Sequence, residues 1–295
     1  MDARALVRRG FVAIEQTGRQ AWRRRTIRGG VDVTDATTTV PCLVLAPHPD
    51  DETLGCGATI ARKRAAGTPV RVVVAADGRS SHRSGVIGQD ELAALRSREV
   101  VDACGVLGID PADVVQLGFE DESLGRRGDE LADAIAAELD AFDYGEIRLP
   151  SGRDWHPDHR DLRTALDRAL AGRSSRPRVL EHPVWLWVHG PWDSDPNGPW
   201  ARRRPVSLAR GYVDRRHWPT AELVRTEGFL GRKRQALLAH RSQTSNLTGE
   251  PGWEVFDEAF LADFLLPVEI AFAAAQGGEG GHDAGPSAAA RSSVT

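Results

Sequence analysis

Short apolar runs alternate with longer amphipathic stretches through the first half of the chain. Leu43-Val44-Leu45-Ala46 and the β-branched run over 70–76 are almost wholly apolar, which is typical of parallel strands buried on both faces. The stretch over 53–66 predicts a helix that ends at Gly67. A strand, a helix and a strand in this order form a βαβ unit, which requires the two strands to be parallel.

The same alternation continues toward the C-terminus. It predicts helices over 90–107, 131–139, 160–171 and 229–240, and strands over 114–117, 147–149 and 184–187. This order favours a single α/β domain with an open, mostly parallel sheet and helices on both faces. The Trp-rich stretch over 188–219 is too long for a simple connection, so we expect it to form a lid or wall.

The two ends of the chain differ from the middle. Residues 1–40 are rich in arginine, and the spacing of Leu6, Val7, Phe11 and Ile14 predicts a basic amphipathic helix. Two interpretations of this extension stay open: weak association with a membrane surface or a partner, and packing on the domain with the arginines in solvent. The expected domain covers 41–276, and the Gly/Ala/Ser-rich residues 277–295 are expected to be a disordered tail.

Composition narrows the classes of function. The chain has 38 Lys+Arg and 42 Asp+Glu, a formal net charge of −4, so it lacks the basic signature of a nucleic-acid-binding protein. No apolar run reaches the roughly 18 residues of a transmembrane helix, and the N-terminus has no secretory signal. Cys42, Cys56 and Cys104 form an odd set without paired spacing, which predicts reduced thiols and a cytoplasmic location. The oligomeric state stays open.

The first candidate for chemistry is the turn Pro47-His48-Pro49-Asp50-Asp51-Glu52, where the first predicted strand meets the next helix. In open α/β sheets, ligands bind outside the carboxyl ends of the strands. One imidazole and several carboxylates therefore converge on a favourable position. The alternative is a helix cap whose carboxylates only stabilise the helix dipole.

A second turn, Trp155-His156-Pro157-Asp158-His159, follows the strand over 147–149. If Pro157 opens the next helix, both histidines can face one cavity; the alternative is a capping turn with its histidines in solvent. Catalytic Zn²⁺ sites keep three protein ligands and one open position.

The two turns together offer such a set. His48, Asp51 and His159 would be the metal ligands, Asp50 the general base, and His156 a cationic group that stabilises an oxyanion.

With both turns in view, the chain resembles the LmbE/PIG-L family of zinc-dependent N-deacetylases. The resemblance runs from about Cys42 to Gln243 and includes further strings: Arg96-Ser97-Arg98-Glu99, Leu117-Gly118 with Asp121, Pro183-Val184-Trp185-Leu186-Trp187, Lys233, and His240-Arg241-Ser242-Gln243. It implies a Rossmann-like domain and a hydrolase that removes an N-acetyl or other acyl group from a small amino-sugar conjugate, such as an N-acetylglucosaminyl compound.

The resemblance also implies site residues. It supports the roles given to the two turns, with Zn²⁺ as the metal, although two histidines and an aspartate also accept Fe²⁺, Co²⁺ or Mn²⁺. Arg96 and Asp121 match positions that contact the substrate in related enzymes. The alternatives are a helix-surface ion pair of Arg96 with Glu99 and a loop-capping role for Asp121. Where some members carry a tyrosine two residues before His156, this chain has Asp154, so no residue is assigned to protonate the leaving amine.

Two other functions remain as alternatives. The first is an amidase acting on a mycothiol-like conjugate with the same residues. The second is a non-catalytic, Rossmann-like nucleotide-binding protein, in which Gly55-Cys56-Gly57 and Gly78 would belong to a phosphate-binding loop. The complete G-x-G-x-x-G string of such a loop is absent from the sequence.

Overall fold

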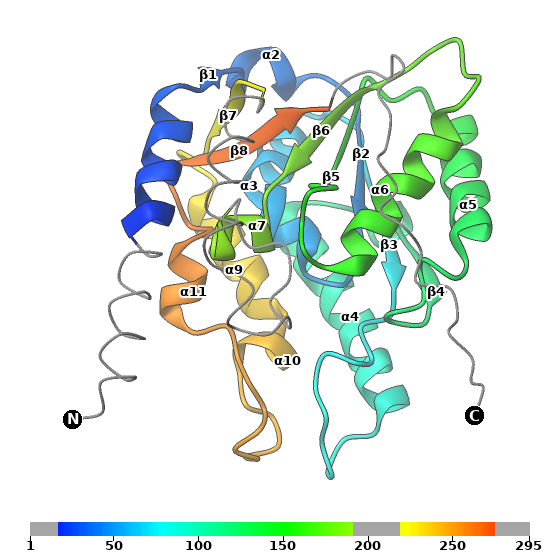
Figure 1. Cartoon of the computed structure of the whole chain (residues 1–295), viewed down its shortest axis with the longest axis vertical. Helices are drawn as coiled ribbons and strands as arrows, with labels where there is room; N and C mark the ends of the chain where they lie inside the picture. Colours follow the sequence, from blue (N-terminus) through cyan, green and yellow to red (C-terminus); the bar gives the residue numbers. More distant parts are fainter. Residues whose placement is uncertain (1–16, 191–218, 275–295) are drawn as a thin grey trace, which may run out of the picture.

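An eight-stranded sheet runs through the part of the chain that the structure describes, residues 17–190 and 219–274 of a computed structural model (Figure 1). The strand order is β1-β7-β8-β6-β5-β2-β3-β4. The strands are β1 (Val31–Asp32), β2 (Cys42–Ala46), β3 (Val70–Ala76), β4 (Val114–Phe119), β5 (Glu146–Pro150), β6 (Arg178–His182), β7 (Ala221–Arg225) and β8 (Val268–Ala273).

Helices cover both faces of the sheet (Figure 1). They are α2 (Thr34–Thr38), α3 (Asp51–Ala65), α4 (Gln89–Leu107), α5 (Gly128–Ala141), α6 (Pro157–Leu170), α7 (Trp185–His189), α9 (Leu230–Ala239), α10 (Arg241–Thr244), α11 (Glu258–Ala262) and the short 3₁₀ helix η1 (Pro111–Asp113). The predicted α/β architecture, with a mostly parallel sheet between helices, is confirmed.

Strand β2 shows why its sequence is apolar throughout. Leu43 and Leu45 belong to the core under α5 and α6, whereas Val44 and Ala46 belong to the core under α3 and α4. Successive side chains of a strand point to opposite faces, so a strand covered on both faces needs apolar residues at every position.

The strand order reverses beside β2 and thereby places the site. Strands β3 and β4 follow on one side of β2, and β5 and β6 on the other, all parallel. The turns that leave β2 and β5 therefore lie next to each other, at the switch point where open α/β sheets bind ligands. The first of these turns carries His48 and the second His156.

One predicted strand is wrong. The strand in this region is β6, over Arg178–His182, and the apolar run that follows Pro183 forms the short helix α7. A run of four apolar residues has no periodicity that separates a strand from a buried helical turn. Because proline cannot donate to the strand ladder, Pro183 ends β6 and the next residues turn away.

The sequence analysis also did not predict the far edge of the sheet. Strand β8 is antiparallel to both β6 and β7, and β1 pairs in parallel with β7. Residues 31–40 thus take part in the sheet or pack against it. The proposed boundary between residues 40 and 41 stays a prediction.

The described part of the basic extension packs against the domain. Residues 17–28 are helical, Trp22 is buried against Trp187 with ring centroids 5.1 Å apart, and Arg23 pairs with Asp263. Arg19 and Arg23 also donate to backbone carbonyls of α7, so some arginines face inward rather than into solvent. Residues 1–16, most of the Trp-rich stretch (191–218) and the predicted tail lie outside the described residues.

A search of the described helices for a membrane span found none that is long and apolar enough.

Candidate active site and metal centre

The turn after β2 is held in an unusual backbone conformation. Asp50 has φ 138°, a region that residues with a side chain rarely adopt. Its N–H donates to Glu52 Oε2 at 3.0 Å, and the N–H of His48 donates to Asp51 Oδ2 at 3.1 Å. The fully buried Glu52 also contacts His240 Nε2 at 3.1 Å. Strain of this kind, fixed by surrounding contacts, is typical of functional sites.

The turn after β5 leads directly into α6. Pro157 occupies the first helical turn, as predicted, and His156 is the N-cap residue. His156 Nδ1 accepts the N–H of Asp158 at 3.2 Å. His159, the third residue of the helix, is completely buried. Both histidines therefore point toward the first turn rather than into solvent.

Among the described residues, two groups of three side chains have donor atoms that all lie within 4.8 Å of one another: His48, His156 and His159, and His48, Asp121 and Asp158. Asp51 contacts two of these histidines, and the predicted ligand set of His48, Asp51 and His159 stays a prediction. Asp51 Oδ2 lies 3.3 Å from His48 Nδ1 and 3.3 Å from His159 Nε2. Tetrahedral Zn²⁺ with ligand bonds of roughly 2.0–2.1 Å places neighbouring ligand atoms about 3.3–3.4 Å apart. Both ring nitrogens of His159 are buried, and neither the contact of Nε2 with Asp51 nor that of Nδ1 with Asp154 has the direction of a hydrogen bond. A buried nitrogen without a hydrogen bond, in a histidine–carboxylate set of this spacing, fits a metal ligand.

Further carboxylates face the far sides of the two imidazoles. His48 Nε2 lies 3.1 Å from both Asp121 Oδ1 and Asp158 Oδ2, and His159 Nδ1 lies 3.2 Å from Asp154 Oδ2. Metal-bound histidines usually have such partners, which orient the ring. Sequence analysis missed this role for Asp154 and Asp158, although both lie within or beside the second turn.

Charges around the cluster shift its pKa values. Burial opposes protonation of His48, but Asp121, Asp158 and Asp51 together raise its pKa well above the usual value. For His159, Asp51 and Asp154 likewise outweigh burial and raise the pKa to about 9. Burial would raise the pKa of Asp51, yet the two histidines lower it well below its usual value. The cluster is therefore rich in negative charge, as a cation site requires.

Asp50 faces a different partner. Arg96 Nη2 lies 2.9 Å from Asp50 Oδ2 and also donates to the carbonyl of Pro49, while Nη1 donates to Gly78 O at 3.0 Å. Burial raises the pKa of Asp50 to about 7, although Arg96 opposes this shift. A carboxylate with a pKa near the working pH suits a general base.

The structure excludes the helix-surface ion pair considered for Arg96 and shows two contacts of Asp121. Arg96 is buried and pairs with Asp50, so it does not form a helix-surface ion pair with Glu99, which instead accepts from Ser242. Asp121 contacts His48 and accepts the N–H of Ser80 at 3.1 Å. Both residues line the cavity, and their role in substrate binding stays a prediction.

His156 differs from the cation that sequence analysis expected. An imidazolium has no acceptor nitrogen, whereas Nδ1 of His156 accepts a hydrogen bond from Asp158. Burial, followed by the neighbouring His48 and His159, lowers the pKa of His156 to about 4. The ring is thus neutral with its proton on Nε2, a tautomer inferred from the hydrogen bond. It can act as a neutral hydrogen-bond donor.

A cavity of about 450 Å³ opens above these residues. His48, Asp50, Asp51 and His156 line it, together with a polar wall and an aromatic wall. The polar wall consists of Ser80, Ser81, His82, Gln243 and Glu254, and the aromatic wall of Trp155, Trp185, Phe256 and Phe260. This volume suits a small molecule of the size of a sugar conjugate.

Gly55 and Gly57, which were considered for a phosphate-binding loop, allow close packing of a helix instead. Gly55 and Gly57 lie inside α3, where a Cβ atom would meet the side chains of His182 and Lys233. They allow close packing of a helix and do not form a loop before it. The structure therefore does not support a phosphate-binding loop at Gly55-Cys56-Gly57.

The fold and the two facing turns define an α/β protein with a histidine–carboxylate centre at the switch point of its sheet. Residues 43–170 match the family model PIG-L, described as GlcNAc-PI de-N-acetylase. Over this segment the chain is similar to the PIG-L family, in agreement with the resemblance carried by its two turns.

A curated relative is also similar to this chain in sequence. The chain is 33% identical over 145 residues to a protein of Bacillus subtilis (strain 168) named as a probable N-acetyl-alpha-D-glucosaminyl L-malate deacetylase 2. The alignment covers 47% of this chain and 65% of the relative, just under two thirds of its length.

Solved structures share the fold. The N,N'-diacetylchitobiose deacetylase of Pyrococcus horikoshii has a TM-score of 0.53 at 20% identity, over 79% of this chain and 83% of its own. The zinc inhibited form of teicoplanin deacetylase Orf2 has a TM-score of 0.56 at 18% identity, over 80% and 100%. The hydratase GalB of Pseudomonas putida KT2440 has a TM-score of 0.51 at 13% identity, over 83% and 100%. Because a hydratase has the same fold, the reaction must be argued from the site.

Proposed function

We propose that this protein is a metal-dependent hydrolase that removes the N-acetyl group from an amino-sugar conjugate, such as an N-acetylglucosaminyl compound. The observation that carries the proposal is the position of Asp51 Oδ2, 3.3 Å from a nitrogen of His48 and of His159, with Asp50 adjacent on the cavity floor. Such a set combines a cation site with a separate base, which hydrolysis of an unactivated amide needs.

His48, Asp51 and His159 would hold the metal, which supplies a Lewis acid for the amide carbonyl and lowers the pKa of water. Asp50 takes a proton from the attacking water, and Arg96 keeps its carboxylate in place. The Nε2–H of His156 donates to the oxyanion of the tetrahedral intermediate. The proton held by Asp50 can then pass to the departing amine, so that acetate and a free amino sugar leave.

The donor set favours Zn²⁺ and also suits Fe²⁺, Co²⁺ and Mn²⁺. Metal content after purification, measured for the protein grown with each metal, identifies the ion. Action in the cytoplasm remains part of the proposal and rests on three buried free cysteines.

The two walls of the cavity suggest how the conjugate lies. Hydroxyl, amide and carboxylate groups of the polar wall suit the sugar, and the aromatic wall suits an apolar second part of the conjugate. Among the described residues that line the cavity, Arg96 is the one Lys or Arg. Its guanidinium already donates hydrogen bonds to Asp50 and to the carbonyls of Pro49 and Gly78. We therefore propose a neutral, apolar aglycone rather than a dicarboxylate such as malate.

The test is to incubate metal-loaded protein with N-acetylglucosaminyl conjugates that carry aryl, alkyl or malyl aglycones and to measure acetate and free amine. Release of both in equal amounts, with the aryl or alkyl conjugate preferred, supports the proposal. Amine release only from an added conjugate whose glucosamine nitrogen carries a larger acyl group would instead indicate an amidase. Asp50→Asn is the control, because it should retain the metal and lose turnover.

A further inference from the structure

Helix α3 is broken one turn after it begins. Cys56 has φ −145° and ψ 24°, outside the helical range. The segment before the break, residues 51–55, carries Asp51 and Glu52 and is too short to be stable as an isolated helix. Its direction must therefore be set by contacts with the rest of the molecule.

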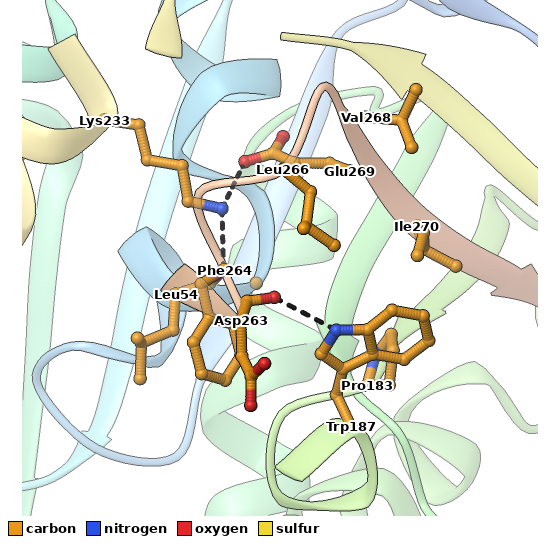
Figure 2. Close-up of a pocket in the computed structure, with 11 residues that line it drawn as sticks. Leu54, Pro183, Trp187, Lys233, Asp263, Phe264, Leu266, Val268, Glu269 and Ile270 are labelled. Carbon is orange, nitrogen blue, oxygen red and sulfur yellow. Dashed lines mark hydrogen bonds and ion pairs between the residues drawn. The ribbon is translucent and has the colours of Figure 1, made fainter. Parts of the chain in front are cut away.

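A buried ion pair spans the break; Figure 2 shows its two side chains, Lys233 and Glu269. Lys233 Nζ lies 2.8 Å from Glu269 Oε1 and donates at 2.8 Å to the carbonyl of Leu54. Glu269 accepts the N–H of Ala58 at 2.8 Å and that of Thr59 at 2.7 Å. In an uninterrupted α-helix, the carbonyl of Leu54 and the N–H of Ala58 would pair with each other. The ion pair thus links the two groups across the break.

The packing around the break is close and leaves little space for a side chain at either glycine. A Cβ atom at Gly55 would lie 1.9 Å from the ring of His182, and one at Gly57 would lie 3.2 Å from Lys233. The side chains of Lys233 and Glu269 are 1% and 3% exposed. Such a pair costs desolvation energy, and replacing it with apolar residues is often neutral or stabilising. A contribution to stability is therefore a weak explanation for the buried pair of Lys233 and Glu269.

We propose that Lys233 and Glu269 are positioning residues for the metal-binding turn. By joining Leu54 to Ala58 across the break, they fix the direction of the first turn of α3 and so the approach of Asp51 to His48 and His159. This inference rests on the proposed function, because it assumes that Asp51 is a metal ligand. It assigns the pair no contact with substrate or metal.

The test measures metal affinity by competition with a chromophoric chelator, together with the melting temperature. Lys233→Met removes the donor to Leu54 and should weaken metal binding about 10- to 100-fold, the usual effect of losing an outer-shell partner. Glu269→Gln keeps the shape and one acceptor oxygen, and should weaken binding in the same direction but less. Because Glu269→Gln is the milder change, its metal affinity tests the proposal even if Lys233→Met does not fold.

A matched control lies at the other end of the same helix. Lys63 is equally buried and pairs with Glu146 at 2.9 Å, far from the site. Lys63→Met should lower the melting temperature as Lys233→Met does, and leave metal affinity unchanged. If Lys233 had only a structural role, Lys233→Met and Lys63→Met would both lower the melting temperature, and both would leave metal affinity unchanged.

Wild-type metal affinity in folded Lys233→Met and Glu269→Gln would overturn the inference, as would an equal loss of affinity in Lys63→Met. The proposed function fails in a different way. A wild-type protein that binds the metal and deacetylates no conjugate would overturn the function and leave the positioning role standing.

Discussion

Arg96 Nη2 donates to Oδ2 of Asp50 at 2.9 Å, and both side chains are buried. The guanidinium also holds the carbonyls of Pro49 and Gly78, so it connects the strained turn to α4 and to the end of β3. In this position Arg96 orients the proposed base. Substrate contact, which the family resemblance implies for Arg96, is a separate role that kinetics can distinguish.

Arg96→Met should lower kcat with little change in KM. Removing the guanidinium leaves a buried carboxylate without its partner, so Asp50 loses its fixed geometry. The loss should be about tenfold or more, yet smaller than the 10²–10⁴-fold effect of deleting the base itself. Steady-state kinetics of metal-loaded protein are the measurement, and exposed Arg98 on the same helix provides the control Arg98→Met. A rise in KM with unchanged kcat would show that Arg96 contacts substrate.

Asp50 and Asp51 are adjacent and should respond differently. Asp50→Asn should keep the metal and lose about 10²–10⁴-fold in kcat, because it removes the base without changing its shape. Asp51→Asn should weaken metal binding, with part of the activity restored by excess metal. Metal stoichiometry and kcat of both variants are the measurements. If Asp50→Asn lost the metal and Asp51→Asn kept it, Asp50 would be the metal ligand and Asp51 the base.

Asp154 should support metal binding without being a ligand. Its Oδ2 lies 3.2 Å from His159 Nδ1 and accepts the N–H of Trp185 at 2.9 Å. Asp154→Ala should weaken metal binding about 10- to 100-fold, because His159 loses the group that orients it. Chelator competition measures the change. Asp167→Asn, on an outward-facing position of α6 with a 60% exposed side chain, should have no effect.

The buried network at the opposite end of the sheet should make stability depend on pH. Burial opposes ionisation of Glu146, but Arg148 and Lys63 lower its pKa to about 2. A folded-state pKa below that of the unfolded chain, about 4.3, stabilises the protein above that value by up to about 3 kcal/mol. This contribution is lost as the pH falls from about 4.3 toward the folded-state pKa.

Glu146→Gln is the corresponding test. The difference in unfolding free energy between wild type and variant should be greatest at pH 6–7 and shrink as the pH falls below about 4.3. Urea denaturation over a pH series measures it, with the exposed Asp102→Asn as control. A difference that stays constant with pH would mean that Glu146 is not ionised in the folded protein.

The aromatic wall should affect one class of substrate. Phe260 packs on Phe256 with ring centroids 4.3 Å apart and lies 5.8 Å from Trp185. Phe260→Ala should raise KM for an aryl conjugate about 2- to 10-fold, from the roughly 0.5–1.5 kcal/mol of an aromatic pair. Unconjugated N-acetylglucosamine should be unaffected. Phe142→Ala, at a 43% exposed position away from the cavity, is the control.

The amino-acid pattern alone is enough to predict the parallel core and the two turns of the site. Strands β2 and β3 follow from continuous runs of apolar residues, because a strand buried on both faces leaves such a local pattern, and β4 and β5 follow from shorter apolar stretches. The positions of His48 and His159 at the ends of such strands were enough to predict that they meet. The strands and the turns are each recognised from residues close together in the chain, and the meeting of the turns follows from the shared edge of parallel strands.

The partners of those residues depend on how the segments of the fold pack together. Arg96 reaches Asp50, Asp154 faces His159, and Glu269 joins Lys233 across the break in α3. The helical turn of α7 and the antiparallel β8 also depended on packing. These contacts join segments whose relative placement depends on strand order and helix packing. Local periodicity carries no information about which buried charge another segment will meet, because that choice is made only when the layers of the fold come together.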